Sequence, residues 1–161
     1  LELGMNPEWL RYYIAAKLNA HVEDLDFNPE DFVARVNSDL VGKYVNIASR
    51  ASNFIIKHFD GQLCFEGKLP GELEAELAAA AESVRTAFEA REYGKAIREV
   101  MAAADRINQA FDAAHPWVLA KQLDDAGNKR ALHETCSRAL AGLPSSTSTS
   151  AGRYSSGSMT T

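Results

Sequence analysis

The chain has 161 residues, of which 46% are hydrophobic, and this is enough apolar material for one packed domain with tails. Its formal net charge of −5 at pH 7 disfavours a protein that coats nucleic acid non-specifically, although it leaves room for a local basic surface. The two cysteines, Cys64 and Cys136, have no matched spacing, so we expect a reducing compartment rather than a disulfide framework.

Two helix starts share one sequence pattern. Residues 6–8 (NPE) and 28–31 (NPED) each supply an N-cap Asn, a Pro at the first helical position and acids in the first turn. The second start opens a run in which Gly42 is the only helix breaker before residues 60–61 (DG). This run predicts one helix of about 30 residues, on the order of 45 Å long.

Further helices are predicted downstream. Residues 70–71 (PG) precede an amphipathic stretch over 72–88, and apolar residues at helical spacing over 93–111 indicate another helix that stops before Pro116. A short segment follows at 117–119, and Asp125 is expected to cap a last helix that carries Leu132, Cys136 and Leu140. No alternation long enough for a sheet occurs, so the predicted fold is an all-α antiparallel helix bundle.

The C-terminal residues 144–161 (PSSTSTSAGRYSSGSMTT) differ in composition from the rest of the chain. Ser, Thr and Gly dominate, and too little apolar surface remains to offset the loss of chain entropy on folding. We expect this tail to be disordered. No signal peptide and no apolar run of roughly 20 residues, the length needed to cross a bilayer, is found, so the expected location is the cytoplasm, with no membrane partner.

Polar side chains form one stripe along the long predicted helix. At about 100° per residue, the stripe lies within roughly 60° of Asn46 and contains Asp39, Lys43, Arg50, Asn53 and Lys57. The opposite side is expected to face the core and contains Val33, Val36, Asn37, Leu40, Tyr44, Ile47, Ala48, Ala51, Phe54 and Ile55. Residues 35–57 carry four basic side chains and one acidic one, so the average charge hides a local basic surface.

Two interpretations of the stripe remain open from the pattern. Any surface helix displays polar residues of this kind, whereas two Asn side chains in mid-helix each cost a few tenths of a kcal/mol unless something uses them. Asn37 falls on the core side, where a buried amide must be hydrogen-bonded, and we expect it to tie helices together. The role of Trp117 is also left open by the pattern. It is either a core packing residue or a platform on which an unpaired base stacks.

Four stretches of the chain resemble one family. "LRYYIAAKL" (10–18), "DFNPEDFVARVNSDLVGKYVNIASR" (26–50), "REYGKAIREVMAAAD" (91–105) and "HPWVLAKQ" (115–122) are similar, in order, to bacterial methionyl-tRNA synthetases of class I. The resemblance covers about residues 1–141 and falls on the part after the catalytic domain. It implies a connector helix over 1–27, an anticodon-binding helix bundle over 28–143 and the tail over 144–161.

The resemblance also implies site residues. In the family, the Asn and Arg of the long helix and the Trp after a Pro recognise the CAU anticodon, and the matching residues here are Asn46, Arg50, Pro116 and Trp117. Trp117 is expected to stack on the first anticodon base, while Asn46 and Arg50 hydrogen-bond to base edges. Lys121 matches a family lysine near the anticodon. Additional RNA contacts are expected from Lys43, Asn53 and Lys57 on the same stripe.

The resemblance has limits. Nothing in the chain is similar to the family's catalytic signatures, so no catalytic residue, metal site or cofactor is expected here, and ATP and zinc would belong to the absent catalytic domain. His133 and Cys136 lie one turn apart, which is a weak zinc signal. The family's last apolar helix is also replaced after residue 141, from which we expect an interrupted coding sequence, a missing or truncated last helix and a marginally stable or self-associating bundle.

Three function classes follow. The favoured one is recognition of the methionine tRNA anticodon stem-loop, with no chemistry by this chain alone, in support of ATP-dependent methionylation by a parent ligase whose catalytic domain is its partner. The second is a helical protein-interaction module without an RNA role. An enzyme with a bundle-core site has little support, because a diiron bundle needs Glu-x-x-His pairs on two helices and the sequence lacks them.

Overall fold

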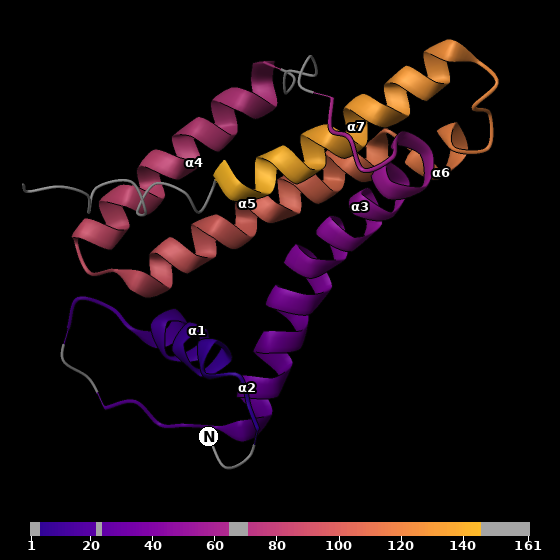
Figure 1. Ribbon diagram of the computed structural model, residues 1–161. Coiled ribbons are helices and arrows are strands. Elements are labelled where there is room, and N and C mark those ends of the chain that lie inside the picture. Colours follow the sequence, from indigo (N-terminus) through magenta and orange to yellow (C-terminus); the bar gives the residue numbers. More distant parts are fainter. Residues whose placement is uncertain (1–3, 22–23, 65–70, 146–161) are drawn as a thin grey trace, which may run out of the picture.

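The protein is described here from a computed structural model that covers residues 4–21, 24–64 and 71–145. The described residues form helices and no strand, which confirms the predicted all-α bundle (Figure 1). In chain order the helices are α1 (Pro7–Lys17), α2 (Pro29–Arg35), η1 (Val36–Val45), α3 (Asn46–Phe59), α4 (Gly71–Glu89), α5 (Tyr93–Ala113), α6 (Pro116–Leu119) and α7 (Ala126–Ser145). None of them is both long enough and apolar enough to span a bilayer.

The long predicted helix exists as one rod made of α2, η1 and α3, and its middle section η1 is a π-helix. A π-turn bonds residue i to i+5 and so holds about one residue more than an α-turn. A wheel drawn at 100° per residue from Asn46 therefore loses phase across η1. This explains two wrong predictions: Asn37 is exposed rather than buried, and Val33 is 53% exposed.

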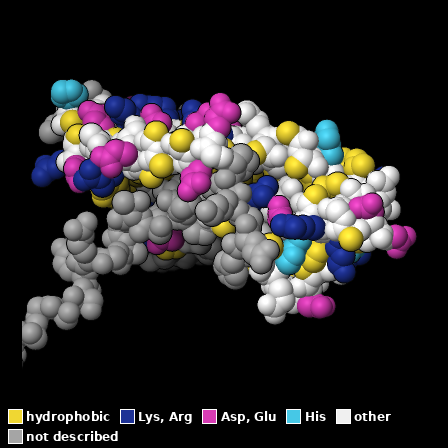
Figure 2. Space-filling model, turned by 90° about the horizontal axis from the view of Figure 1, so that it is seen from above, with side chains coloured by type: hydrophobic (Ala, Val, Ile, Leu, Met, Phe, Trp, Pro, Cys, Tyr) yellow, Lys and Arg dark blue, Asp and Glu magenta, His cyan; other side chains and the backbone are white. Residues whose placement is uncertain are grey.

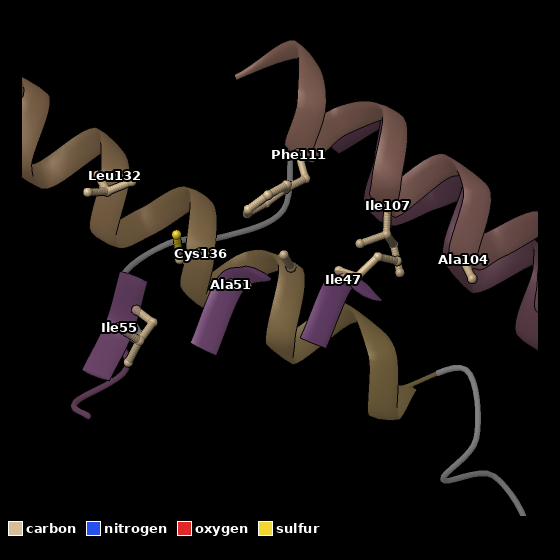
Figure 3. Close-up of a cluster of buried hydrophobic side chains, with 9 residues drawn as sticks. Ile47, Ala51, Ile55, Ala104, Ile107, Phe111, Leu132 and Cys136 are labelled. Carbon is tan, nitrogen blue, oxygen red and sulfur yellow. The ribbon is translucent and has the colours of Figure 1, made fainter. Parts of the chain in front are cut away.

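The main core lies where three helices meet. It is lined by Ile47, Ala51 and Ile55 of α3, Ala104, Ile107 and Phe111 of α5, and Leu132, Cys136 and Ala139 of α7 (Figure 3). The predicted core positions on α3 are therefore confirmed where the helix is α-helical. Burial raises the pKa of the Cys136 thiol to about 12, so this sulfur is a packing group and not a nucleophile.

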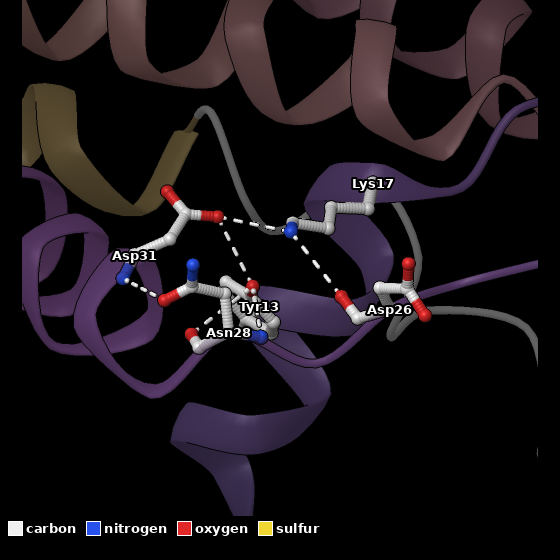
Figure 4. Close-up of polar contacts among 5 residues, drawn as sticks. All are labelled: Tyr13, Lys17, Asp26, Asn28 and Asp31. Atoms are coloured by element: carbon white, nitrogen blue, oxygen red, sulfur yellow. Dashed lines mark hydrogen bonds and ion pairs between the residues drawn. The ribbon is translucent and has the colours of Figure 1, made fainter.

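A second, smaller cluster joins the connector to the lower end of the rod. Its buried members are Tyr13, Phe32 and Val36. The Tyr13 hydroxyl donates to Asp31 Oδ2 at 3.0 Å and accepts from the Asn28 backbone N–H at 3.3 Å. Lys17 Nζ lies 3.0 Å from the same Asp31 oxygen (Figure 4). Hydrogen bonds of the Tyr13 hydroxyl and the ion pair between Lys17 and Asp31 thus hold α1 against α2.

Helix α1 also packs on α5, and Gly94 makes this contact possible. The Gly94 N–H donates to the Leu18 carbonyl at 2.8 Å. A Cβ atom at position 94 would lie only 2.8 Å from the Ala16 carbonyl oxygen and 3.1 Å from that of Leu18. Only glycine fits such a close backbone approach, so Gly94 lets α1 pack closely against α5.

The last helix begins and ends close to the predicted positions. Asp125 Oδ1 accepts from the Asn128 N–H at 2.9 Å, which confirms it as the capping residue. The helix runs to Ser145, so residues 144 and 145, predicted to lie in the tail, belong to its last turn. Extending an existing helix by two residues needs no new nucleus. The rest of the predicted tail lies outside the described residues.

Candidate functional site

The structure brings together two predicted site residues that lie 67 positions apart in sequence. The Arg50 guanidinium carbon is 5.5 Å from the centroid of the Trp117 ring and 5.2 Å from that of Phe111. Trp117 remains 39% exposed, and the Arg50 side chain is 34% exposed. A cation over an aromatic face contributes about 0.5–1 kcal/mol at a site of this exposure. The pair is therefore a preformed surface feature with one apolar and one charged component.

Helix α6 presents Trp117 because the chain turns sharply before it. Pro116 occupies the first helical position and is fully buried, where its fixed φ favours a helix start. His115, the N-cap residue, has a left-handed backbone with φ 47° and ψ 53°, a conformation in which His is several-fold enriched among residues other than glycine. Pro116 thus anchors the short helix in the bundle and leaves the next side chain at the surface.

Two carboxylates of α5 neutralise the basic stripe. Arg50 Nη2 donates to Asp112 Oδ1 at 2.8 Å, and Lys43 Nζ donates to Asp105 Oδ2 at 2.7 Å. All four side chains are partly exposed, so each pair contributes about 0.2–1 kcal/mol. Figure 2 shows basic and acidic side chains interleaved over one face of the molecule. The stripe is therefore balanced in charge along this contact, and Lys43 is less available to a partner from solution than its wheel position predicts.

The other predicted residues lie on the same side of the bundle or next to it. Asn46 is the first residue of α3, directly after the π-helix, and its side chain is exposed. Asn53 and Lys57 continue along α3 and are exposed as well. Lys121 is exposed in the turn after α6, where its backbone N–H bonds to the Val118 carbonyl at 3.1 Å. Each of these side chains is open to a partner from solution.

The sequence did not predict that three residues of α5 belong to this site: Asp105, Phe111 and Asp112. A signal for two of them was present, because the two acids are seven positions apart, like Lys43 and Arg50. Equal spacing on two helices that run in the same direction places the charges opposite one another every two turns. The sequence alone did not tell which helices are neighbours.

The weak zinc signal at His133 finds a structural explanation. The His133 ring stacks on Phe59 with centroids 4.0 Å apart, and its Nε2 lies 2.7 Å from the Gln62 carbonyl oxygen. Cys64 and Cys136 are both free thiols. Within the described part of the chain, no group of three or more His, Cys, Asp or Glu side chains is arranged to hold a metal ion.

Known proteins match this chain in sequence and in fold. A family model described as tRNA synthetases class I (M) matches residues 1–52. The chain is 56% identical over 140 residues to the methionine--tRNA ligase of Burkholderia vietnamiensis (87% of this chain, 19% of that protein). It is 59% identical over 143 residues to the ligase of Methylibium petroleiphilum, and 55% identical over 140 residues to that of Neisseria meningitidis serogroup B, each covering 87% of this chain and 20% of the relative.

Among solved structures, Mycobacterium tuberculosis methionyl-tRNA synthetase in complex with methionyl-adenylate matches with a TM-score of 0.65 and 27% identity, covering 86% of this chain and 29% of that chain. The chain is thus similar in sequence and in fold to class I tRNA synthetases. Over most of its own length it is homologous to the methionine--tRNA ligases. It spans about a fifth of the length of the curated relatives that it matches.

Proposed function

We propose that this chain recognises the CAU anticodon of methionine tRNA as the anticodon-binding portion of a methionine--tRNA ligase. The observation that carries the proposal is the contact between Arg50 and Trp117 at the surface, in a chain homologous to methionine--tRNA ligases. Helix α3 supplies Arg50 and the short helix α6 supplies Trp117. Asn46 lies exposed one helical turn before Arg50.

The chemistry of these groups suits an unpaired base. Anticodon bases offer their hydrogen-bonding edges and their flat faces, and proteins meet them with amides, guanidinium planes and aromatic rings. In the proposed complex the Trp117 indole stacks on the first anticodon base, while Asn46 and Arg50 hydrogen-bond to base edges. Asp112, which holds Arg50 at 2.8 Å, limits the directions in which the guanidinium can point.

The proposed role of the chain is recognition, and the chemistry belongs to the rest of the ligase. The parent would activate methionine with ATP and transfer it to the tRNA, so we propose its catalytic domain and methionine tRNA as the partners of this chain. The chain alone should neither exchange pyrophosphate with ATP nor aminoacylate tRNA, and it should bind no zinc. Either activity in the purified chain would contradict this division of labour.

Titration with two RNA hairpins tests the proposal. One hairpin carries the CAU anticodon and the other differs only in the first anticodon base, both at the same stated salt concentration because RNA affinity depends on salt. We expect tighter binding of the CAU hairpin. Equal affinity would contradict specific recognition and favour an interaction module, for which Val41, Val45 and Ile56 offer exposed apolar side chains.

Paired substitutions locate the binding site. Trp117→Ala should lower the affinity for the CAU hairpin by about 1–3 kcal/mol, the contribution of one stacked base. Trp9→Ala is the matched control, because Trp9 is 42% exposed, similar to the 39% of Trp117, and lies on α1. If both substitutions had the same effect, a site at Trp117 would be excluded.

Arginine substitutions give a second pair. Arg50→Ala should cost about 1.5–3 kcal/mol of binding free energy if the guanidinium donates to a base edge. Arg106→Ala removes an arginine that is likewise ion-paired across two helices, with Glu76 at 3.1 Å. Its effect on RNA affinity should be small. The comparison separates a specific contact at Arg50 from the loss of one positive charge anywhere on the bundle.

A further inference from the structure

The imidazole of His115 is a part of this surface to which neither the sequence nor the family resemblance gives a role. Its ring centroid lies 5.6 Å from that of Trp117, with the planes inclined by 74°. This is an edge-to-face arrangement, one of the two geometries that aromatic pairs prefer. The Trp117 indole therefore has two planar neighbours, the Arg50 guanidinium from α3 and the His115 imidazole from the turn before α6.

The backbone hydrogen bonds of His115 do not involve its side chain. The His115 N–H donates to the Asp112 carbonyl at 3.1 Å, and its carbonyl accepts from the N–H groups of Val118 and Leu119 at 2.8 and 3.3 Å. The side chain makes no capping hydrogen bond to α6 and is exposed. The ring is thus neither a helix cap nor a core group, and its contact is with Trp117.

The left-handed backbone of His115 determines where that ring lies. A non-glycine residue with φ 47° adopts a strained conformation, and residues of this kind cluster at functional sites. Asp112 links the two neighbours of the indole, since its side chain holds Arg50 and its carbonyl holds the His115 N–H. Arg50, Trp117 and His115 therefore form one connected unit at the end of α5.

We propose that His115 is a positioning residue: its imidazole, held against Trp117 by the left-handed turn, fixes the orientation in which the indole meets the first anticodon base. This inference rests on the proposed function. Without the ring, the indole would sample further rotamers, and part of the binding free energy would be spent on ordering it. Both affinity for the CAU hairpin and discrimination of the first base should then fall.

His115→Asn is the decisive substitution. Asn tolerates the left-handed conformation as His does, so this change removes the ring and keeps the turn. The variant should bind the CAU hairpin about two- to tenfold more weakly, as expected for the loss of one aromatic pair, and its preference over the altered hairpin should shrink. His115→Phe, which keeps an aromatic ring, should restore both. His21→Asn, a change of the same kind at an exposed histidine after α1, should have no effect.

A spectroscopic measurement tests the ring contact without RNA. The chain has two tryptophans, so Trp9→Phe leaves Trp117 as the single indole. In this background, His115→Asn should weaken the near-ultraviolet circular dichroism band of Trp117 while far-ultraviolet spectra and the melting temperature stay the same. His115→Phe should keep the band, and a melt of that variant checks that the bulkier ring is accepted in the turn.

The outcomes separate the two proposals. If the unmodified chain discriminates between the hairpins and His115→Asn discriminates equally well with an unchanged dichroism band, the positioning role is wrong and the proposed function stands. If the unmodified chain does not discriminate, the proposed function is wrong and the positioning role falls with it. Loss of the band together with loss of discrimination in His115→Asn, restored by His115→Phe, supports both.

Discussion

The two ends of the long rod are stabilised in different ways. At the bundle end, α3 buries Ile47 and Ile55 against α5 and α7, in a core with members such as Leu132 that are fully inaccessible to solvent. At the connector end, η1 and α2 meet α1 around the Tyr13 hydroxyl and the Asp31 carboxylate. Apolar burial is strong and non-directional, whereas hydrogen bonds are directional and weaker in net effect.

The difference indicates how the two ends serve the proposed function. The contact between Arg50 and Trp117 lies at the bundle end, directly above Phe111 of the main core. A rigid, apolar support suits a surface that must hold two groups at a fixed separation. The connector end, held by fewer and more polar contacts, should open at a lower free energy. The following four substitutions probe this contrast, from the largest expected effect to the smallest.

Leu132→Ala should have the largest effect. Leu132 is 0% exposed in the main core, and truncation of a buried Leu costs about 2–5 kcal/mol through lost transfer free energy and the cavity that remains. Urea denaturation followed by far-ultraviolet circular dichroism measures the change in free energy of unfolding. Val118→Ala, at a site that is 45% exposed, is the control and should change it by less than about 0.5 kcal/mol.

Gly94→Ala should separate the connector from the bundle. The new Cβ atom would meet the Ala16 carbonyl oxygen at 2.8 Å, and overpacking of this kind costs about 1–3 kcal/mol. Hydrogen exchange should show faster exchange in α1 and little change in α3. Gly71→Ala places a Cβ atom in open space and should leave both helices as they are. Equal protection of α1 in both variants would show that the packing of α1 on α5 does not depend on the close backbone approach at Gly94.

Tyr13→Phe tests the polar centre of the connector. The substitution keeps the buried ring and removes the hydroxyl that bonds to Asp31 and to the Asn28 N–H. We expect a loss of about 1–2 kcal/mol, because the Tyr13 hydroxyl bonds to a charged carboxylate and to a partly buried N–H, and both lose this partner. Tyr93→Phe serves as the control in a thermal melt. A loss as large as that of Leu132→Ala would mean that the connector is as tightly coupled as the main core.

Asp31→Asn gives the smallest effect and a pH signature. Hydrogen bonds from Lys17 and then Tyr13 lower the pKa of Asp31, and hydrogen bonds with Tyr13 and then Asp31 raise the pKa of Lys17. A lowered carboxyl pKa contributes stability above the ordinary value of 3.8 that is lost as the pH falls through the folded value. A raised amine pKa contributes stability below 10.5 that is lost at higher pH.

The melting temperature of the unmodified chain should therefore exceed that of Asp31→Asn over the neutral range, and the difference should shrink below about pH 4. Glu30→Gln, an adjacent acid in the same first turn, is the matched control. A difference that is independent of pH would show that Asp31 stabilises the connector through packing and not through its charge.

Much of the fold follows from local signals in the sequence. The N-cap Asn and Pro pairs at residues 6–7 and 28–29 begin α1 and α2 as predicted, and Asp125 caps α7. These signals act within one turn of chain, so the sequence contains them in full. The π-helix η1 is different, because a single residue added to a turn leaves no mark in the apolar pattern, and it reversed the predicted burial of Asn37.

The sequence by itself determined the all-α class, the helix boundaries to within a few residues and the likeness to methionyl-tRNA synthetases. These depend on local propensity, on apolar periodicity and on the order of matching segments. Only the tertiary structure decided that Arg50 lies over Phe111 and Trp117, that Asp105 and Asp112 neutralise the stripe, and that His115 borders the indole. Those contacts arise where α3, α5 and α6 meet, and the packing of separate helices against one another sets them.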